Sequence, residues 1–148
     1  MRKLEAKDLK SMGLFKHYRV VRRWAAKTHK ITDADLELLI YLDCIDLFKR
    51  QDFVDGLHTY SWDKRRWEKL LKGEWIKVWR SRNRTTQKYN IYTVSFKGKQ
   101  LISRIYRILL GTEDLPTSLK RNSIMKGDTY SDRAMIKAIN KVNKDKNR

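Results

Sequence analysis

The most constraining feature of the sequence is a single switch from helical periodicity to two β-forming runs and back. Residues 75–80 and 89–94 are rich in aromatic and β-branched side chains. Between them, residues 81–88 are polar throughout and carry basic groups. Two such runs joined by a polar segment predict one antiparallel hairpin with a charged tip. Because the patterns elsewhere are helical, we expect a mostly α fold with a small β-hairpin, of the α+β class.

Two helices are predicted near the N-terminus. Residues 8–28 repeat apolar side chains every three or four positions, which gives one apolar stripe. Thr32 is a good N-cap, because its hydroxyl can accept a hydrogen bond from a first-turn amide. The helix that follows Thr32 is predicted to continue to Leu47. It is apolar on several sides, which is typical of a helix at the centre of a core.

A pair of shorter helices is predicted next. Residues 50–57 form the first, and a turn is expected at His58 and Thr59. Ser61 is the predicted cap of a second, basic helix over residues 61–72, which is expected to end where Gly73 follows.

After the hairpin, one long helix is predicted over residues 96–110, capped by Ser95 and ended by Gly111. Residues 111–130 show little periodicity and include a proline, so we expect a linker. Residues 131–142 are predicted to form a short final helix.

The length of 148 residues suits one domain with an appendage. We therefore divide the chain into residues 1–110, a domain with flanking helices, and residues 111–148, a basic linker with a short C-terminal helix and tail.

Charge is the strongest indication of a partner. The formal net charge is +18, from 35 Lys and Arg against 17 Asp and Glu. Net charge by segment is +8 over 1–30, −5 over 31–60, +9 over 61–100 and +6 over 101–148. Such an excess repels itself unless a polyanion screens it, so nucleic acid is the first candidate partner. An anionic membrane surface and an acidic protein are the second and third.

Other features narrow the class of protein. Apolar runs are too short to span a membrane, and Cys44 is the only cysteine, so a cytoplasmic, reducing compartment is expected. His17, His29 and His58 are far apart and have no neighbours at metal-ligand spacing. The sequence contains no phosphate-cradling glycine loop and no nucleophile motif. We therefore expect neither an enzyme nor a metal or other cofactor.

The order of short helix, turn, basic helix and hairpin predicts a winged helix-turn-helix, whose second helix enters the major groove of duplex DNA. With Trp67 turned inward at about 100° per residue, the outward face is almost uniformly basic. The residues of that face, with the last at its flank, are Ser61, Trp62, Arg65, Lys69, Lys72 and Arg66. Arg65 is the candidate for a bidentate contact with guanine, and Lys69 and Lys72 are candidates for phosphate contacts. Trp62 either stacks on the DNA or packs against the hairpin.

The hairpin is expected to act as the wing. Arg82, Arg84 and Lys88 lie in its loop, and an arginine at such a tip can enter a narrow minor groove. The alternative is a solvated turn whose charge prevents pairing between sheet edges of different molecules.

Three segments resemble the MarR family of winged-helix proteins: residues 31–42, 67–73 and 92–102. They are similar to the family's second helix, to the end of its recognition helix, and to the strand that leads into its last long helix. The resemblance covers roughly residues 8–110. It implies a homodimer whose first and last helices interdigitate, and transcriptional regulation at pseudo-palindromic sites.

A second hypothesis is a structural role in a nucleoprotein particle, such as a virion interior or a ribonucleoprotein. The basic first helix and the basic tail from Lys120 favour it. A regulator should prefer its own site over random DNA by ~10³ or more, whereas a packaging protein should show a ratio near one.

Overall fold

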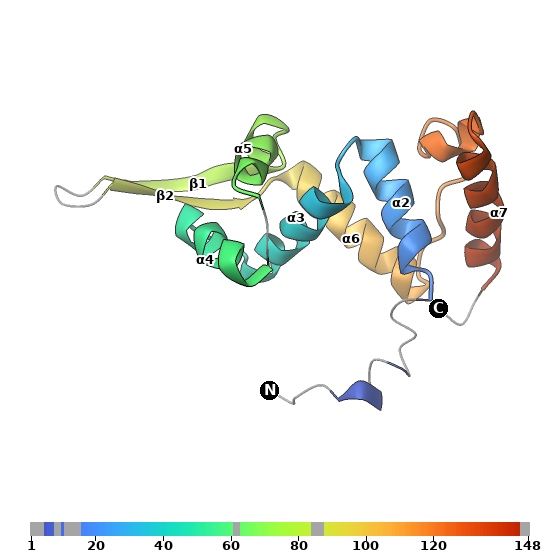
Figure 1. The fold of residues 1–148 in the computed structure, drawn as a ribbon, viewed down its shortest axis with the longest axis horizontal. Coiled ribbons are helices and arrows are strands. Elements are labelled where there is room, and N and C mark those ends of the chain that lie inside the picture. The colour runs from blue at the N-terminus through green and yellow to red at the C-terminus, as the bar shows by residue number, and fades with distance from the viewer. Residues whose placement is uncertain (1–4, 8–9, 11–15, 61–62, 84–87, 146–148) are drawn as a thin grey trace. The chain divides into compact units, whose positions relative to one another are not determined.

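The computed structural model describes residues 5–7, 10, 16–60, 63–83 and 88–145 (Figure 1). These residues are mostly helical with a small two-stranded antiparallel sheet, so the α+β class is confirmed. The elements are α2 (Tyr18–His29), α3 (Asp33–Ile45), α4 (Arg50–Tyr60), α5 (Arg65–Lys72), β1 (Ile76–Asn83), β2 (Lys88–Val94), α6 (Phe96–Leu110), the 3₁₀ turn η1 (Ser123–Lys126) and α7 (Tyr130–Lys144).

The chain divides into two compact units. The first, which we call the hairpin unit, is Thr32–Ile102. The second, the terminal unit, combines Met1–Ile31 with Ser103–Arg148. The expected boundary at residue 110 differs from this division, because α6 contributes its first half to one unit and its second half to the other.

Helix α3 begins as predicted. The Thr32 hydroxyl accepts a hydrogen bond from the Asp35 amide at 3.2 Å, which satisfies one donor of the first turn. The helix ends at Ile45, two residues before the predicted end, because Asp46 has a φ of 76° that a right-handed helix cannot continue. Its buried apolar residues lie on several sides, as expected for a central helix: Leu36, Leu38, Leu39 and Leu42.

The next two helices differ from their predicted bounds. Helix α4 continues through His58 and Thr59, where a turn was predicted, and ends at Tyr60. Helix α5 begins at Arg65 rather than at Ser61, which lies outside the described residues. The carboxylate of Asp63 accepts a hydrogen bond from the Arg65 amide at 2.8 Å. Asp63 therefore supplies the N-terminal acceptor that the prediction had assigned to a serine.

The strands extend further than the β-forming runs. Their register pairs Ile76 with Val94 at one end and Asn83 with Lys88 at the other. Arg82 and Lys88, predicted in the loop, therefore belong to the strands, because backbone hydrogen bonds hold a polar segment in a ladder as well as an apolar one.

A third segment joins the sheet at the other edge of β2. The amide of Phe48 donates to the Tyr92 carbonyl at 3.0 Å, and the Tyr92 amide donates to the Phe48 carbonyl at 2.7 Å. This bridge fixes the start of α4 beside the strand.

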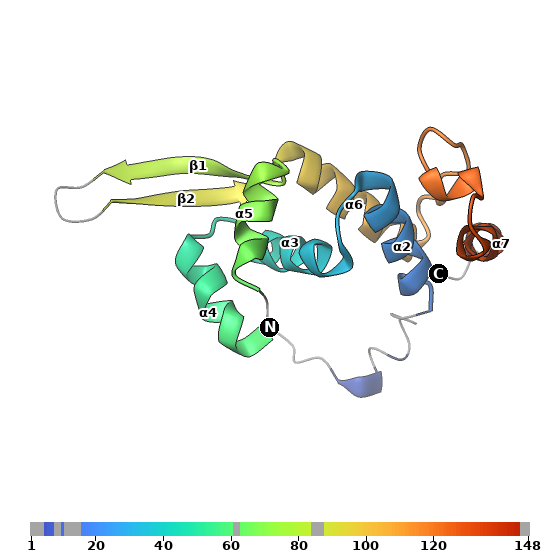
Figure 2. The same cartoon turned by 45° about the horizontal axis from the view of Figure 1, so that its top comes forward.

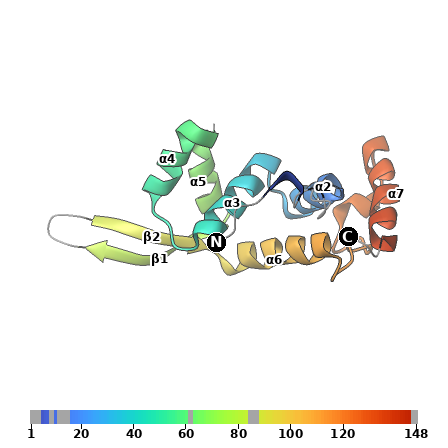
Figure 3. The same ribbon diagram turned by 90° about the horizontal axis from the view of Figure 1, so that it is seen from below.

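Aromatic packing joins α4, α5 and the hairpin. Trp67 is only 1% exposed, stacks on Phe53 with ring centroids 5.5 Å apart, and meets Tyr92 edge-on at 5.0 Å. Figure 3 shows α4 and α5 next to each other, with the hairpin running past both. These contacts make α5 part of a rigid body rather than a loosely attached helix.

Helix α6 matches its prediction over residues 96–110, and the Ser95 hydroxyl accepts from the Gly98 amide at 3.2 Å. Gly98 is required by close packing: a Cβ atom there would lie 2.5 Å from Val94 Cγ1 and 3.1 Å from the Trp75 carbonyl oxygen. The start of α6 is therefore held tightly against the base of the hairpin.

In the terminal unit, the predicted helix over residues 8–28 is interrupted. Lys16 and His17 form a turn, and α2 begins only at Tyr18. The imidazole of His17 forms a 2.8 Å hydrogen bond with Asp145, just after α7, so this turn is tied to the far end of the chain. Trp24 is fully buried, and its indole donates to the Arg121 carbonyl at 3.1 Å.

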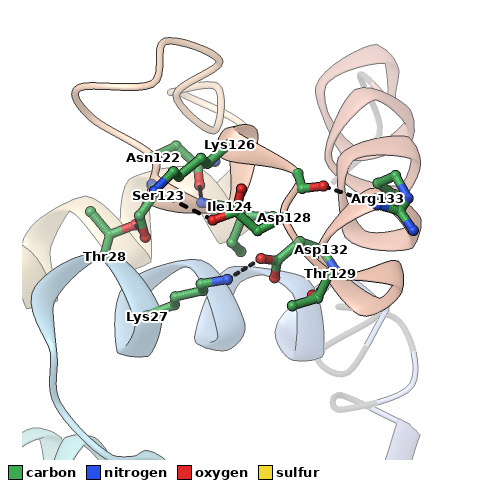
Figure 4. A network of polar contacts seen from close by, with 11 residues as sticks. Lys27, Thr28, Asn122, Ser123, Ile124, Lys126, Asp128, Thr129, Asp132 and Arg133 are labelled. Carbon is green, nitrogen blue, oxygen red and sulfur yellow. Dashed lines mark hydrogen bonds and ion pairs between the residues drawn. The ribbon is translucent and has the colours of Figure 1, made fainter.

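The segment predicted as a linker is anchored to α2 (Figure 4). Lys27 forms an ion pair with the buried Asp132, and the Ser123 amide donates to the Thr28 hydroxyl at 3.2 Å. The side chain of Asn143 exchanges two hydrogen bonds with the backbone of Leu115, at 2.8 and 3.0 Å. Residues 111–145 are thus a packed part of the terminal unit, held by these polar contacts and by buried apolar side chains such as Leu115 and Ile124.

Candidate nucleic-acid interface

Helix α5 presents its cations outward. Trp67 and Leu70 are each 1% exposed and define the inward side, whereas Arg65, Lys69 and Lys72 are all exposed. At about 100° per residue these three side chains leave the helix within about 60° of one another. Figure 2 shows α5 beside the base of the hairpin, which projects beyond the helices of its unit. The result is one cationic ridge on a rigid support.

Arg65 is ordered by a neighbouring carboxylate. Its Nη2 donates to Asp63 Oδ2 at 2.9 Å, and its Nε lies 3.3 Å from both oxygens of the same carboxylate. The side chain nevertheless remains 85% exposed. These hydrogen bonds lower the pKa of Asp63 to about 2, so the pair stays ionised at neutral pH. Asp63 therefore occupies one edge of the guanidinium and leaves the Nη1 side toward solvent.

Arg66 has a different environment. Its Nη1 donates to Asp35 Oδ1 at 2.9 Å, and the two side chains are 25% and 7% exposed. This ion pair joins α5 to α3 inside the hairpin unit. We predicted Arg66 at the flank of the outward face. In the structure its side chain is turned inward, toward Asp35.

The hairpin carries cations that the sequence analysis missed. Lys77 and Arg80 are exposed on β1, next to Trp79, which is 50% exposed. The β-forming residues of this run predict a strand, and their pattern gives the charges between them no role. One feature of the sequence could have indicated a basic surface on the hairpin: residues 75–112 contain no Asp or Glu.

Three predicted contact residues lie outside the described residues: Ser61, Trp62 and Arg84. For Arg82 and Lys88 the backbone is described, and it places both in the ladder of the hairpin.

Several acidic residues of the hairpin unit serve as caps or ion-pair partners. Lys99 lies 3.8 Å from Asp43 and 3.4 Å from Asp46, and the Lys49 amide donates to Asp52 at 2.8 Å. Within the described ranges, no group of three or more His, Cys, Asp or Glu side chains is arranged to hold a metal ion. In the same part of the chain, no helix has both the length and the apolar character that crossing a bilayer requires.

Comparisons of the chain with models of known protein families, with curated proteins and with solved structures return no match.

Proposed function

We propose that the hairpin unit is a winged helix-turn-helix domain that binds duplex DNA, with α5 in the major groove and the hairpin as the wing. The order of its elements supports this: α3, the bridging Phe48, α4, a short connection, α5, β1 and β2. A helix-turn-helix followed directly by a hairpin is the layout in which the second helix reads the groove.

The observation that carries the proposal is the cationic ridge of Arg65, Lys69 and Lys72, opposite the buried Trp67. A groove-facing helix needs its cations on one side and a fixed anchor on the other, because its phosphate contacts position the side chain that reads the base.

Arg65 is the base-reading residue of this proposal. A guanidinium donates from two adjacent edges, and Asp63 takes the edge that contains Nε. The edge formed by Nη1 and the second proton of Nη2 can then donate to O6 and N7 of one guanine. Asp63 acts as a positioning residue, because it restricts the rotation of a side chain that would otherwise be free.

For the wider role we propose a MarR-like transcriptional regulator that acts as a homodimer. Its support is the likeness of the three segments named above, together with the rigid docking of α5. The second candidate is a structural nucleic-acid-binding protein, and the exposed cations outside α5 favour it, because phosphate contacts need no base sequence.

The decisive experiment compares two charge-matched variants in a fluorescence anisotropy titration with a labelled duplex. Lys69→Gln/Lys72→Gln removes two exposed lysines three positions apart on α5. Lys141→Gln/Lys144→Gln removes two exposed lysines at the same spacing on α7 of the terminal unit. We expect only the α5 variant to lower the slope of log affinity against log salt by about 2.

Equal losses for both variants would refute the α5 interface, because they would mean that only the total charge matters. Selection of bound sequences from a random duplex pool then separates the two roles. A regulator requires a selected site preferred by ~10³ or more over random duplex, and a packaging protein gives a ratio near one.

A further inference from the structure

Strand β1 contains a bulge that changes which residues share a face. Val78 is paired with Tyr92, and Arg80 rather than Trp79 is paired with Ile91. Trp79 is therefore the extra residue, and every position beyond it in β1 is shifted by one relative to the pleat.

This shift brings to one face two basic residues that would otherwise lie on opposite faces. Paired residues lie on the same face of an antiparallel ladder, and so do residues two apart in one strand. Lys77 is paired with Thr93 and Arg80 with Ile91. Because these partners are two apart along β2, both basic positions belong to one face. An unbulged strand would place Arg80 on the opposite face from Lys77.

That face is turned away from α5. Tyr92 lies between Ile91 and Thr93 in β2, and its ring meets Trp67 of α5 at 5.0 Å. Since neighbouring residues of a strand point to opposite faces, Ile91 and Thr93 face away from α5. Lys77 and Arg80, which are paired with them, therefore lie on the side opposite the α5 anchor.

A further cation reaches the same face from the start of α4. The Lys49 ammonium lies 4.3 Å from the centroid of the Tyr89 ring, and Tyr89 is two residues from Ile91 in β2 and therefore on the same face. Lys49, Lys77 and Arg80 are all exposed. The hairpin itself contributes no carboxylate to this surface, because residues 75–112 contain none.

We propose that this face, which we call the outer hairpin face, binds the phosphates of a second duplex segment while α5 binds the first. The inference rests on the proposed DNA binding through α5. A cationic sheet face without carboxylates is complementary to a phosphate backbone, and this face is turned away from α5. The protein thereby links two stretches of DNA.

The test is a bridging assay with one duplex fixed on beads and a second, labelled duplex in solution, at about 100 mM salt. The variant is Lys77→Gln/Arg80→Gln in the full-length protein. We expect its affinity for a single duplex, measured by titration at low protein concentration, to stay within about 2-fold of wild type because the two faces are separate. We expect recovery of the labelled duplex on the beads to fall by roughly 10-fold or more, as two phosphate contacts are lost.

Conservative replacement supplies the control. Lys77→Arg/Arg80→Lys keeps both charges and should bridge two duplexes as wild type does. If the two side chains served only the strand structure, the loss of bridging would not follow the loss of charge in the Gln variant. Circular dichroism spectra of both variants should match that of wild type, since both side chains are exposed.

The outer hairpin face is refuted if wild type does not bridge, or if the Gln variant bridges normally. It is also refuted if that variant loses single-duplex affinity as strongly as Lys69→Gln/Lys72→Gln, because the two surfaces would then be one. Aggregation of the Gln variant in the absence of DNA would also refute the proposal. It would mean that these cations serve to prevent pairing between sheet edges of different molecules. Failure of wild type to bind any duplex would instead refute the proposed function itself.

Discussion

Replacing Arg66 by Met tests whether this residue holds α5 in place or contacts DNA. The substitution keeps an unbranched side chain and removes the donor to Asp35, whose side chain is only 7% exposed. Removal of one partner from a fully buried ion pair costs about 3–5 kcal/mol, because the other charge stays buried without compensation. Arg66 is 25% exposed and water can partly replace it, so we expect a loss of about 2–3 kcal/mol.

The measurement is urea unfolding followed by circular dichroism, with the midpoint and slope fitted together. In a thermal unfolding scan, the same loss should lower the Tm of a chain of this size by about 5–10 °C. Arg65→Met is the matched control, because it removes the neighbouring guanidinium from an exposed pair and should leave the unfolding free energy unchanged. A double-mutant cycle with Asp35→Asn should give a coupling of about 1–3 kcal/mol.

Two results would contradict this reasoning. One is an Arg66→Met protein as stable as wild type, or a cycle without coupling. The other is a folded Arg66→Met protein, well below its Tm, that binds duplex DNA as poorly as Arg65→Met. The second result would return Arg66 to the set of DNA contacts.

Three further predictions follow from individual contacts. Trp67→Ala should destabilise the protein by about 3–5 kcal/mol in the same urea assay, because the side chain is 1% exposed and contacts two other rings; a smaller loss than for Trp79→Ala would contradict the assigned core. Glu113→Gln should destabilise at neutral pH: burial raises the pKa of Glu113, but hydrogen bonds from Arg104 and Arg107 outweigh it and leave a net lowering. The stability from this carboxylate is present above its unfolded pKa of 4.5 and is lost as pH falls through the lower folded value, so the variant and wild type should converge in acid unfolding curves. Asp63→Asn should bind random duplex more tightly than wild type, because a phosphate-repelling charge is removed, yet discriminate less at the base pair read by Arg65; unchanged discrimination in a set of single-substituted duplexes would exclude the positioning role.

Much of the hairpin unit could be predicted because its signals are local. Thr32 caps α3 through its own side chain, and Ser95 does the same for α6. The inward position of Trp67 and the outward position of Lys69 follow from helical periodicity alone. Each of these requires information from only a few neighbouring residues.

Two of the errors arose where a distant partner decides the local structure. Arg66 belongs by periodicity to the flank, but Asp35, thirty-one positions away, draws it inward. Residues 111–130 show little apolar periodicity, and hydrogen bonds of Ser123 with Thr28 and of Leu115 with Asn143 fix them in place. Such pairs cannot be identified from spacing, because the fold alone brings their members together.

The bulge at Trp79 is the clearest case of missing information. A strand read from the sequence has a strict period of two, which places Arg80 on the face opposite Lys77. The register of the hairpin reverses that assignment after Trp79. The cationic outer hairpin face is therefore a consequence of one extra residue in the ladder.

Carboxylates in the hairpin unit determine which kind of contact each cation can make. Asp35 holds Arg66 inside, and Asp63 orders Arg65 while leaving it exposed. Lys69, Lys77 and similar exposed ammonium groups are point charges that suit phosphate and carry no base preference. In the proposed complex the strongest base preference is therefore expected at the position that Arg65 reaches, whereas the exposed lysines add affinity for any duplex.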